Sequence, residues 1–211
     1  TASNDAGVPY VYVWREGNPE EFPHVGAAAN GTAPKIAPIF CCMINKGSVW
    51  PAGTEFMPFA VDRGLFYTGA TFEHREWDFC YTGRERGSSY TAWRRDLPGP
   101  HRLLGYVDFV EYLDVLRRSK MTAAVDSGRY VASRGLEAMA CGQVVFWDDG
   151  EALRRTGLVA NRDFLVCGCT WEGNESVPAR DMALLARLAG NRDWWTHLSE
   201  NARRSIASAA S

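Results

Sequence analysis

Lysine is nearly missing from this chain of 211 residues, which contains only Lys35, Lys46 and Lys120. Arginine therefore carries most of the positive charge, and its planar guanidinium can bind phosphate or carboxylate groups through paired hydrogen bonds. An excess of either charge is missing as well, because 23 Lys and Arg stand against 25 Asp and Glu, for a formal net charge of -2. This balance argues against non-specific binding to nucleic acid or to an anionic membrane surface.

Cysteine pairs with the CxxC spacing of zinc sites do not occur among the six cysteines. Most of the cysteines stand in apolar segments such as IFCCMI and LVCGC, so we expect reduced, buried thiols and a cytoplasmic protein. Long hydrophobic runs are missing too. No run approaches the ~20 residues of a membrane span, and the polar first residues do not resemble a secretory signal.

Short apolar runs and amphipathic stretches alternate along the sequence. In the first part, segments 8–14, 36–44 and 56–62 have the composition of strands. Alternation of strands and helices from there on predicts βαβ units, and the right-handed crossover rule makes 76–170 a Rossmann-like, doubly wound layer. The expected strands are 76–83, 103–107, 121–126, 143–149 and 162–168, and the expected helices are 108–118, 134–141, 151–157, 178–189 and 191–208.

The stretch SRGLEAMACG, residues 133–142, predicts a helix that begins after a strand and a loop. Ser133 is expected to be its N-cap, and Gly135 is expected to let the backbone approach a ligand closely. The first N–H groups and the helix dipole form an anion site, to which Arg129 and Arg134 add donors. A diphosphate fits this chemistry.

One carboxylate, Glu137, stands among residues of that helix that should be buried, Leu136, Ala138, Met139 and Ala140. A carboxylate only accepts hydrogen bonds, and beside a bound nucleotide its partners would be the paired hydroxyls of a ribose. The alternative is an exposed residue on an amphipathic helix without a ligand. Spacing alone does not separate the two interpretations.

LEAMACG at 136–142, followed by QVVFWDD at 143–149, resembles the nucleotide-sugar-binding half of GT-B glycosyltransferases, in the group-1 and CgeB-like branches. FMPFAVDRGLF, DFCYTGR and MTAAVDS agree with that family in their order, and the resemblance covers about residues 56–208. It implies an α/β protein with a Rossmann-like doubly wound parallel sheet of GT-B type and a reduced or truncated N-terminal part. The implied domains are 1–60, a remnant of or link to an acceptor-side domain, 61–190, the donor-binding domain, and 191–211, a C-terminal helix that packs back.

The resemblance implies sugar transfer from a nucleoside-diphosphate sugar, a UDP-sugar by family precedent, to an acceptor hydroxyl, with no metal or other cofactor. The acceptor stays open among glycan, lipid, protein and modified DNA base, and a missing domain or second chain is an expected partner. Arg84 and Arg129 are expected to neutralise the leaving diphosphate, and His24 to act as general base. Tyr106 and Val107 would meet the base, and Lys120 either meets phosphate or caps a helix C-terminus. The expected nucleotide-binding residues are Gly83, Tyr106, Val107, Lys120, Ser133, Arg134, Gly135, Leu136 and Glu137.

Two departures from the family pattern leave other functions open. Retaining group-1 enzymes carry a second acid eight residues before the one in LEA, where this chain has Arg129, and only 1–60 precedes the donor half. A nucleotide-binding or partner-binding module without catalysis therefore remains an alternative, as does a sugar-nucleotide epimerase.

Asp148 and Asp149 favour a turn over a metal site, because Gly150 follows them.

Overall fold

The structure is a computed structural model that describes residues 12–14, 39–41, 54–56, 61–67, 70–82, 97–105, 107–124, 131–147, 151–168 and 178–209. The chain divides into two compact units, Thr1–Pro58 and Phe59–Ser211. In the first unit, three short strands form a parallel sheet in the order β1-β2-β3. These strands are β1 (Tyr12–Trp14), β2 (Ile39–Cys41) and β3 (Thr54–Phe56).

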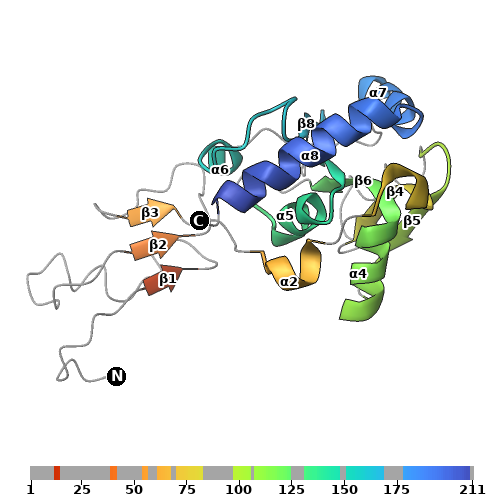
Figure 1. The fold of residues 1–211 in the computed structure, drawn as a ribbon. Helices are drawn as coiled ribbons and strands as arrows, with labels where there is room; N and C mark the ends of the chain where they lie inside the picture. The colour runs from red at the N-terminus through yellow and green to blue at the C-terminus, as the bar shows by residue number, and fades with distance from the viewer. Residues whose placement is uncertain are drawn as a thin grey trace, which may run out of the picture. The chain divides into compact units, whose positions relative to one another are not determined.

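The second unit is built on a five-stranded sheet in which every neighbouring pair is parallel (Figure 1). Its order is β5-β4-β6-β7-β8, so the strands lie in the order 2-1-3-4-5 of their sequence within this unit. This order is that of flavodoxin-like doubly wound folds, and it confirms the expected fold class. The strands are β4 (Trp77–Thr82), β5 (His101–Leu104), β6 (Ser119–Ala124), β7 (Val144–Trp147) and β8 (Leu165–Val166).

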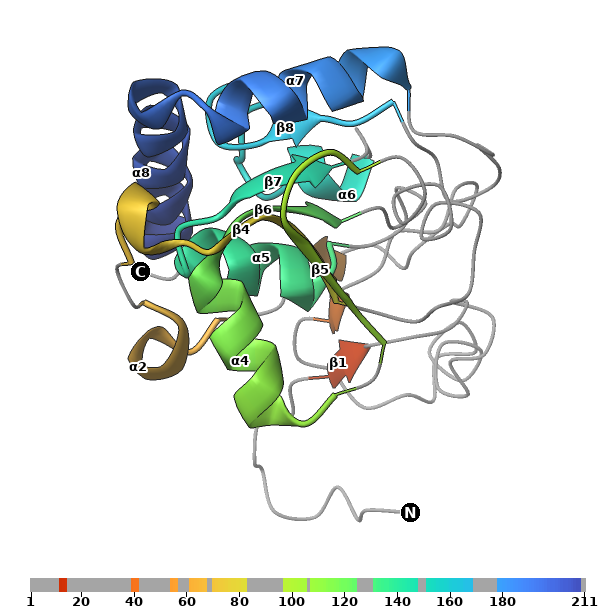
Figure 2. The same cartoon turned by 90° about the vertical axis from the view of Figure 1, so that its right-hand side faces the viewer.

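Helices cover both faces of this sheet (Figure 2). On one face α5 packs against β6 and β7, and α4 packs against β4, while α7 and α8 supply side chains to the core on the other face. The sequence did not predict α2 and η2, which stand in the connection before β4. The helices described in this unit are α2 (Arg63–Phe66), η2 (Phe72–His74), α4 (Phe109–Arg118), α5 (Ser133–Ala140), α6 (Glu151–Arg154), α7 (Ala179–Ala189) and α8 (Arg192–Ala209).

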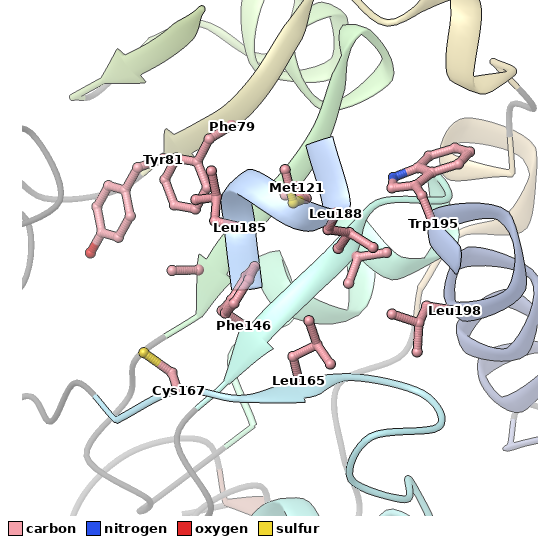
Figure 3. Close-up of a cluster of buried hydrophobic side chains, with 12 residues drawn as sticks. Phe79, Tyr81, Met121, Phe146, Leu165, Cys167, Leu185, Leu188, Trp195 and Leu198 are labelled. Carbon is pink, nitrogen blue, oxygen red and sulfur yellow. The ribbon is translucent and has the colours of Figure 1, made fainter. Parts of the chain in front are cut away.

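The core beneath α7 and α8 collects alternate residues of the central strands (Figure 3). Both faces of β7 are buried, which explains its continuous apolar sequence VVFW. In β6 every residue except Lys120 is buried. Trp195 anchors α8 in this core, and its indole N–H donates to the Lys120 carbonyl at 2.9 Å. The buried cluster consists of Phe79, Tyr81, Met121, Ala123, Val144, Phe146, Leu165, Cys167, Leu185, Leu188, Trp195 and Leu198.

The end of α5 is set by Gly142, which has a φ of 79°. Its N–H donates to the Met139 carbonyl at 2.9 Å, and the N–H of Gln143 donates to the Ala138 carbonyl at 2.9 Å. These two bonds form a Schellman motif, which needs a left-handed residue directly after the C-cap. The final glycine of LEAMACG therefore has a structural reason that is independent of any ligand.

Replacing Gly142 by alanine is expected to cost about 1–2 kcal/mol of unfolding free energy, because an L-residue is strained at this φ. The new Cβ would also stand 3.1 Å from Arg75 Nη2 and from Ser199 Oγ. Chemical denaturation would measure the loss. Gly190→Ala is the matched control, because Gly190 also ends a helix but has a φ of -98° and no atom closer than 4.0 Å to its added Cβ. Equal losses in the two variants would contradict the prediction.

Candidate nucleotide-binding site

The carboxyl ends of parallel strands share one edge of a doubly wound sheet, and ligands bind at that edge where the strand order reverses. Here the reversal lies between β4, which ends at Thr82, and β6, which ends at Ala124. Helix α5 begins at Ser133, after the connection that follows β6. Five of the expected site residues, His24, Gly83, Arg84, Tyr106 and Arg129, lie outside the described residues.

The start of α5 differs by one residue from the sequence prediction. Ala132 is the N-cap, and no side chain caps the helix, so the expected capping role of Ser133 is wrong. Ser133 is the first helical residue instead, because the carbonyl of Ala132 already accepts the N–H of Gly135 at 3.0 Å. The first turn contains no acidic residue, so no carboxylate of that turn neutralises the positive end of the helix dipole.

Arg134 connects the start of α5 with the end of β4. Its guanidinium carbon lies 5.5 Å from the centre of the Tyr81 ring, a cation–π distance. Tyr81 is the penultimate residue of β4, so the first turn of α5 lies beside the strand on the other side of the reversal point. The geometry therefore places a cationic side chain at the edge where the fold binds ligands.

Gly135 and Leu136 have packing roles. A Cβ on Gly135 would stand 2.5 to 2.8 Å from three atoms of the Trp147 ring, so only glycine lets α5 pack this closely on β7. Leu136 is 3% exposed and belongs to the hydrophobic interior. The sequence pattern predicted that Gly135 lets the backbone approach a ligand. The structure shows instead that Gly135 makes room for the Trp147 ring.

Glu137 is half-buried on α5, and the hydroxyl of Tyr112 donates to its Oε2. Burial raises the pKa of Glu137 above its ordinary value, while the Tyr112 hydrogen bond opposes that rise. Burial and the neighbouring carboxylate raise the pKa of the Tyr112 hydroxyl, which therefore keeps its proton. Sequence reasoning missed Tyr112, although a hydroxyl on the helix directly after the expected base-binding residues was a usable signal.

Val107 and the beginning of α4 stand next to this pair in the sequence. Val107 is half-buried, and the following Asp108 is the N-cap of α4, with its carboxylate accepting the N–H of Glu111 at 2.9 Å. Tyr112 lies one turn further along the same helix, and its N–H donates to the Asp108 carbonyl at 3.0 Å. The segment expected to meet a base therefore leads directly into α4, the helix whose Tyr112 hydroxyl donates to Glu137.

Lys120 lies apart from these residues. It is the second residue of β6, at the amino end of the strand, and its Nζ donates to Asp78 Oδ1 at 2.8 Å and to the Ala189 carbonyl at 3.2 Å. Ala189 is the last residue of α7. Of the two roles expected for Lys120, the structure supports the helix C-cap and separates this lysine from the phosphate-binding candidates.

Within the part of the chain that the structure describes, no group of three or more His, Cys, Asp or Glu side chains is arranged to hold a metal ion. Asp148 and Asp149 lie outside that part. No helix that the structure describes is both long and apolar enough to cross a membrane.

No protein-family model matches the sequence, and no curated protein matches it. Solved structures do match its fold. The C-terminal domain of LpcC, a group 1 family glycosyl transferase from Francisella tularensis, aligns with a TM-score of 0.53 at 12% identity, over 71% of this chain and 97% of that domain. A glycosyltransferase from Rickettsia africae ESF-5 aligns with a TM-score of 0.63 at 9% identity, over 95% of this chain and 66% of its own.

Anabaena HepE, solved in complex with UDP-glucose, aligns with a TM-score of 0.60 at 12% identity, over 95% of this chain and 68% of its own. Identities this low establish a shared fold and leave activity to the site residues. The expectation of a Rossmann-like fold of GT-B type is confirmed: this chain has the fold of GT-B glycosyltransferases.

Proposed function

We propose that this chain binds a UDP-sugar at the carboxyl edge of its second sheet and transfers the sugar to an acceptor hydroxyl. The observation that carries the proposal is Glu137, a half-buried carboxylate one turn into the helix that begins at the reversal point. Its two oxygens can accept the two hydroxyls of a ribose. HepE, which shares the fold, was solved with UDP-glucose, and this supports the choice of uridine.

The diphosphate is proposed to lie at the N-terminus of α5, beside Arg134. Arg84 stands two residues after the end of β4, and Arg129 lies between β6 and α5, so both are proposed to add positive charge there. Transfer breaks the bond between the anomeric carbon and the diphosphate oxygen, and a new bond forms from that carbon to the acceptor oxygen. Arginines that stabilise the departing diphosphate make a metal ion unnecessary in this proposal.

The remaining expected residues complete the proposal. Tyr106 and Val107 would contact the base, because they directly precede the capped start of α4. His24 is proposed to remove the proton of the acceptor hydroxyl as that oxygen attacks. The chemical class of the acceptor stays open among glycan, lipid, protein and modified DNA base.

A thermal-shift screen with UDP, GDP, ADP, TDP and CMP tests the donor site. Ligand at 100 times its Kd stabilises a protein by about 2.7 kcal/mol, which raises the Tm by roughly 5–10 °C for a chain of this size. We expect the largest shift with UDP and a small shift with CMP, which lacks the second phosphate. Absence of a shift with every nucleotide would contradict the proposal.

Turnover separates the proposal from its two alternatives. Incubation with UDP-glucose and a panel of hydroxyl acceptors should release UDP and yield a glycosylated acceptor. Conversion of the donor to its epimer without any acceptor would identify an epimerase instead. Binding without turnover of any donor, with all acceptors supplied, would identify a binding module.

A further inference from the structure

The hydroxyl of Tyr112, on α4, donates a hydrogen bond to Oε2 of Glu137, on α5. We propose that Tyr112 is a positioning residue that aims the Glu137 carboxylate at the ribose, so that α4 and α5 together select ribonucleotides over nucleotides without ribose hydroxyls. The inference rests on the proposed nucleotide site and adds to it the residue that sets its sugar selectivity.

The position of Tyr112 is held from three sides. Asp108 fixes the start of α4 through its capping bond to the Glu111 N–H. Phe109 packs against the Tyr112 ring at a centroid distance of 6.4 Å. The next residue, Leu113, is buried in the core with Leu116 one turn later, so α4 cannot rotate without exposing them. The hydroxyl that reaches Glu137 therefore comes from a rigid element.

The hydrogen bond leaves the carboxylate free for two further donors. An ionised carboxylate offers about four lone-pair positions, and Tyr112 occupies one of them, on Oε2. Among the described residues, no donor bonds to Oε1, and two neighbouring ribose hydroxyls need two acceptor positions. Without Tyr112, the glutamate side chain could adopt other rotamers, and the cost of ordering it would reduce the affinity of every ligand that uses it.

The direction of the hydrogen bond between Tyr112 and Glu137 also favours the ionised form of the Glu137 carboxylate. Tyr112 keeps its proton because its pKa is raised, so its hydroxyl donates to Glu137. Its donation lowers the pKa of Glu137 against the effect of burial. Tyr112 thus helps to keep Glu137 in the form that only accepts hydrogen bonds.

The test compares UDP with 2′,3′-dideoxy-UDP in titration calorimetry of the full chain. For the unmodified protein we expect UDP to bind roughly 10-fold to 150-fold more tightly, the range for hydrogen bonds to a charged group. Tyr112→Phe keeps the aromatic ring and removes the hydroxyl. It should reduce this ratio by about threefold to tenfold, a part of the effect of Glu137 itself. The affinity for dideoxy-UDP should be unchanged, because Tyr112 acts only through Glu137.

Tyr67→Phe is the matched control, because the Tyr67 hydroxyl bonds to the Arg203 carbonyl on α8 at 3.5 Å and should leave the ratio unchanged. Glu137→Gln should lower the ratio at least as far as Tyr112→Phe. Failure of the unmodified protein to bind UDP would overturn the proposed function itself. A lowered ratio in Glu137→Gln with an unchanged ratio in Tyr112→Phe would overturn only this inference. Equal weakening of both ligands by Tyr112→Phe would overturn it too, since that is the effect of a general structural role.

Discussion

Replacing Arg75 by methionine is expected to lower the free energy of unfolding by about 2–4 kcal/mol, because several buried carbonyl groups lose their donors. Arg75 is 5% exposed and stands before β4. Its Nη1 donates to the carbonyls of Ser119 and Leu116, and its Nη2 donates to those of Cys141 at 2.6 Å and Ala70 at 3.2 Å. The guanidinium carbon also lies 4.9 Å from the centre of the Trp195 ring.

Two of these acceptors explain why the effect should be large. Leu116 lies in the last turn of α4, and Cys141 is the C-cap of α5, so one cation serves the negative ends of both helices. Burial lowers the pKa of Arg75 to about 10, and the side chain is still charged at neutral pH. Methionine fills a similar length but donates nothing, so the carbonyls stay buried without this partner.

Thermal and urea denaturation of Arg75→Met would measure the loss, as a Tm lower by roughly 4–16 °C. Arg118→Met is the matched control. Arg118 stands at the end of α4 and pairs with Glu76 and Asp114, but its side chain is 38% exposed. Surface ion pairs contribute little, so this variant should unfold almost as the unmodified protein does. A loss for Arg75→Met no larger than that of the control would show that the carbonyls find other donors.

The sheet and most helices were predictable because their signals are local. The amphipathic stretch FVEYLDVLRR indicates a helix with one buried face, and the continuous apolar run VVFW indicates a buried strand. The structure places α4 and β7 inside the ranges predicted from them. The connection before β4 is different. The single turns α2 and η2 are too short to show a period, and the sequence gives no sign that Arg75 binds carbonyls far along the chain.

The candidate site was predictable where it follows topology and not where it depends on tertiary contacts. Glu137 stands on the predicted helix at the predicted edge. Lys120 lies at the opposite, amino end of β6. The sequence did not predict this place, because it depends on the residue at which β6 begins. Gly135 serves the packing of Trp147, and Tyr112 meets Glu137 across two helices; neither contact can be read from spacing along one element.

Glu137→Gln is expected to make the ligand-free protein more stable at neutral pH and to weaken its binding of UDP. Burial raises the pKa of Glu137 in the folded state, so folding disfavours the ionised form. The resulting penalty is absent at low pH, appears as the pH rises through the pKa of the unfolded chain, and is complete above the folded pKa. Glutamine removes the charge, and its amide oxygen can still accept from Tyr112.

Differential scanning calorimetry at neutral pH and at about pH 4 would measure this change in stability. The Tm gain of Glu137→Gln should be present at neutral pH and vanish in acid, where the glutamate is itself protonated. Glu76→Gln is the control, because Glu76 is an exposed acid paired with Arg118 and should not gain stability or lose UDP affinity. A lower Tm for Glu137→Gln at neutral pH would contradict the expected direction of the change.

Binding is expected to change in the opposite direction. Glu137→Ala should weaken UDP binding by about 1.5–3 kcal/mol, the scale of hydrogen bonds to a charged acceptor, or roughly 10-fold to 150-fold in Kd. If the carboxylate only supported the fold, its removal would lower the stability of the protein and leave its affinity for UDP unchanged. A half-buried carboxylate that lowers stability and raises affinity serves ligand binding. Unchanged UDP affinity in both Glu137 variants would contradict this role.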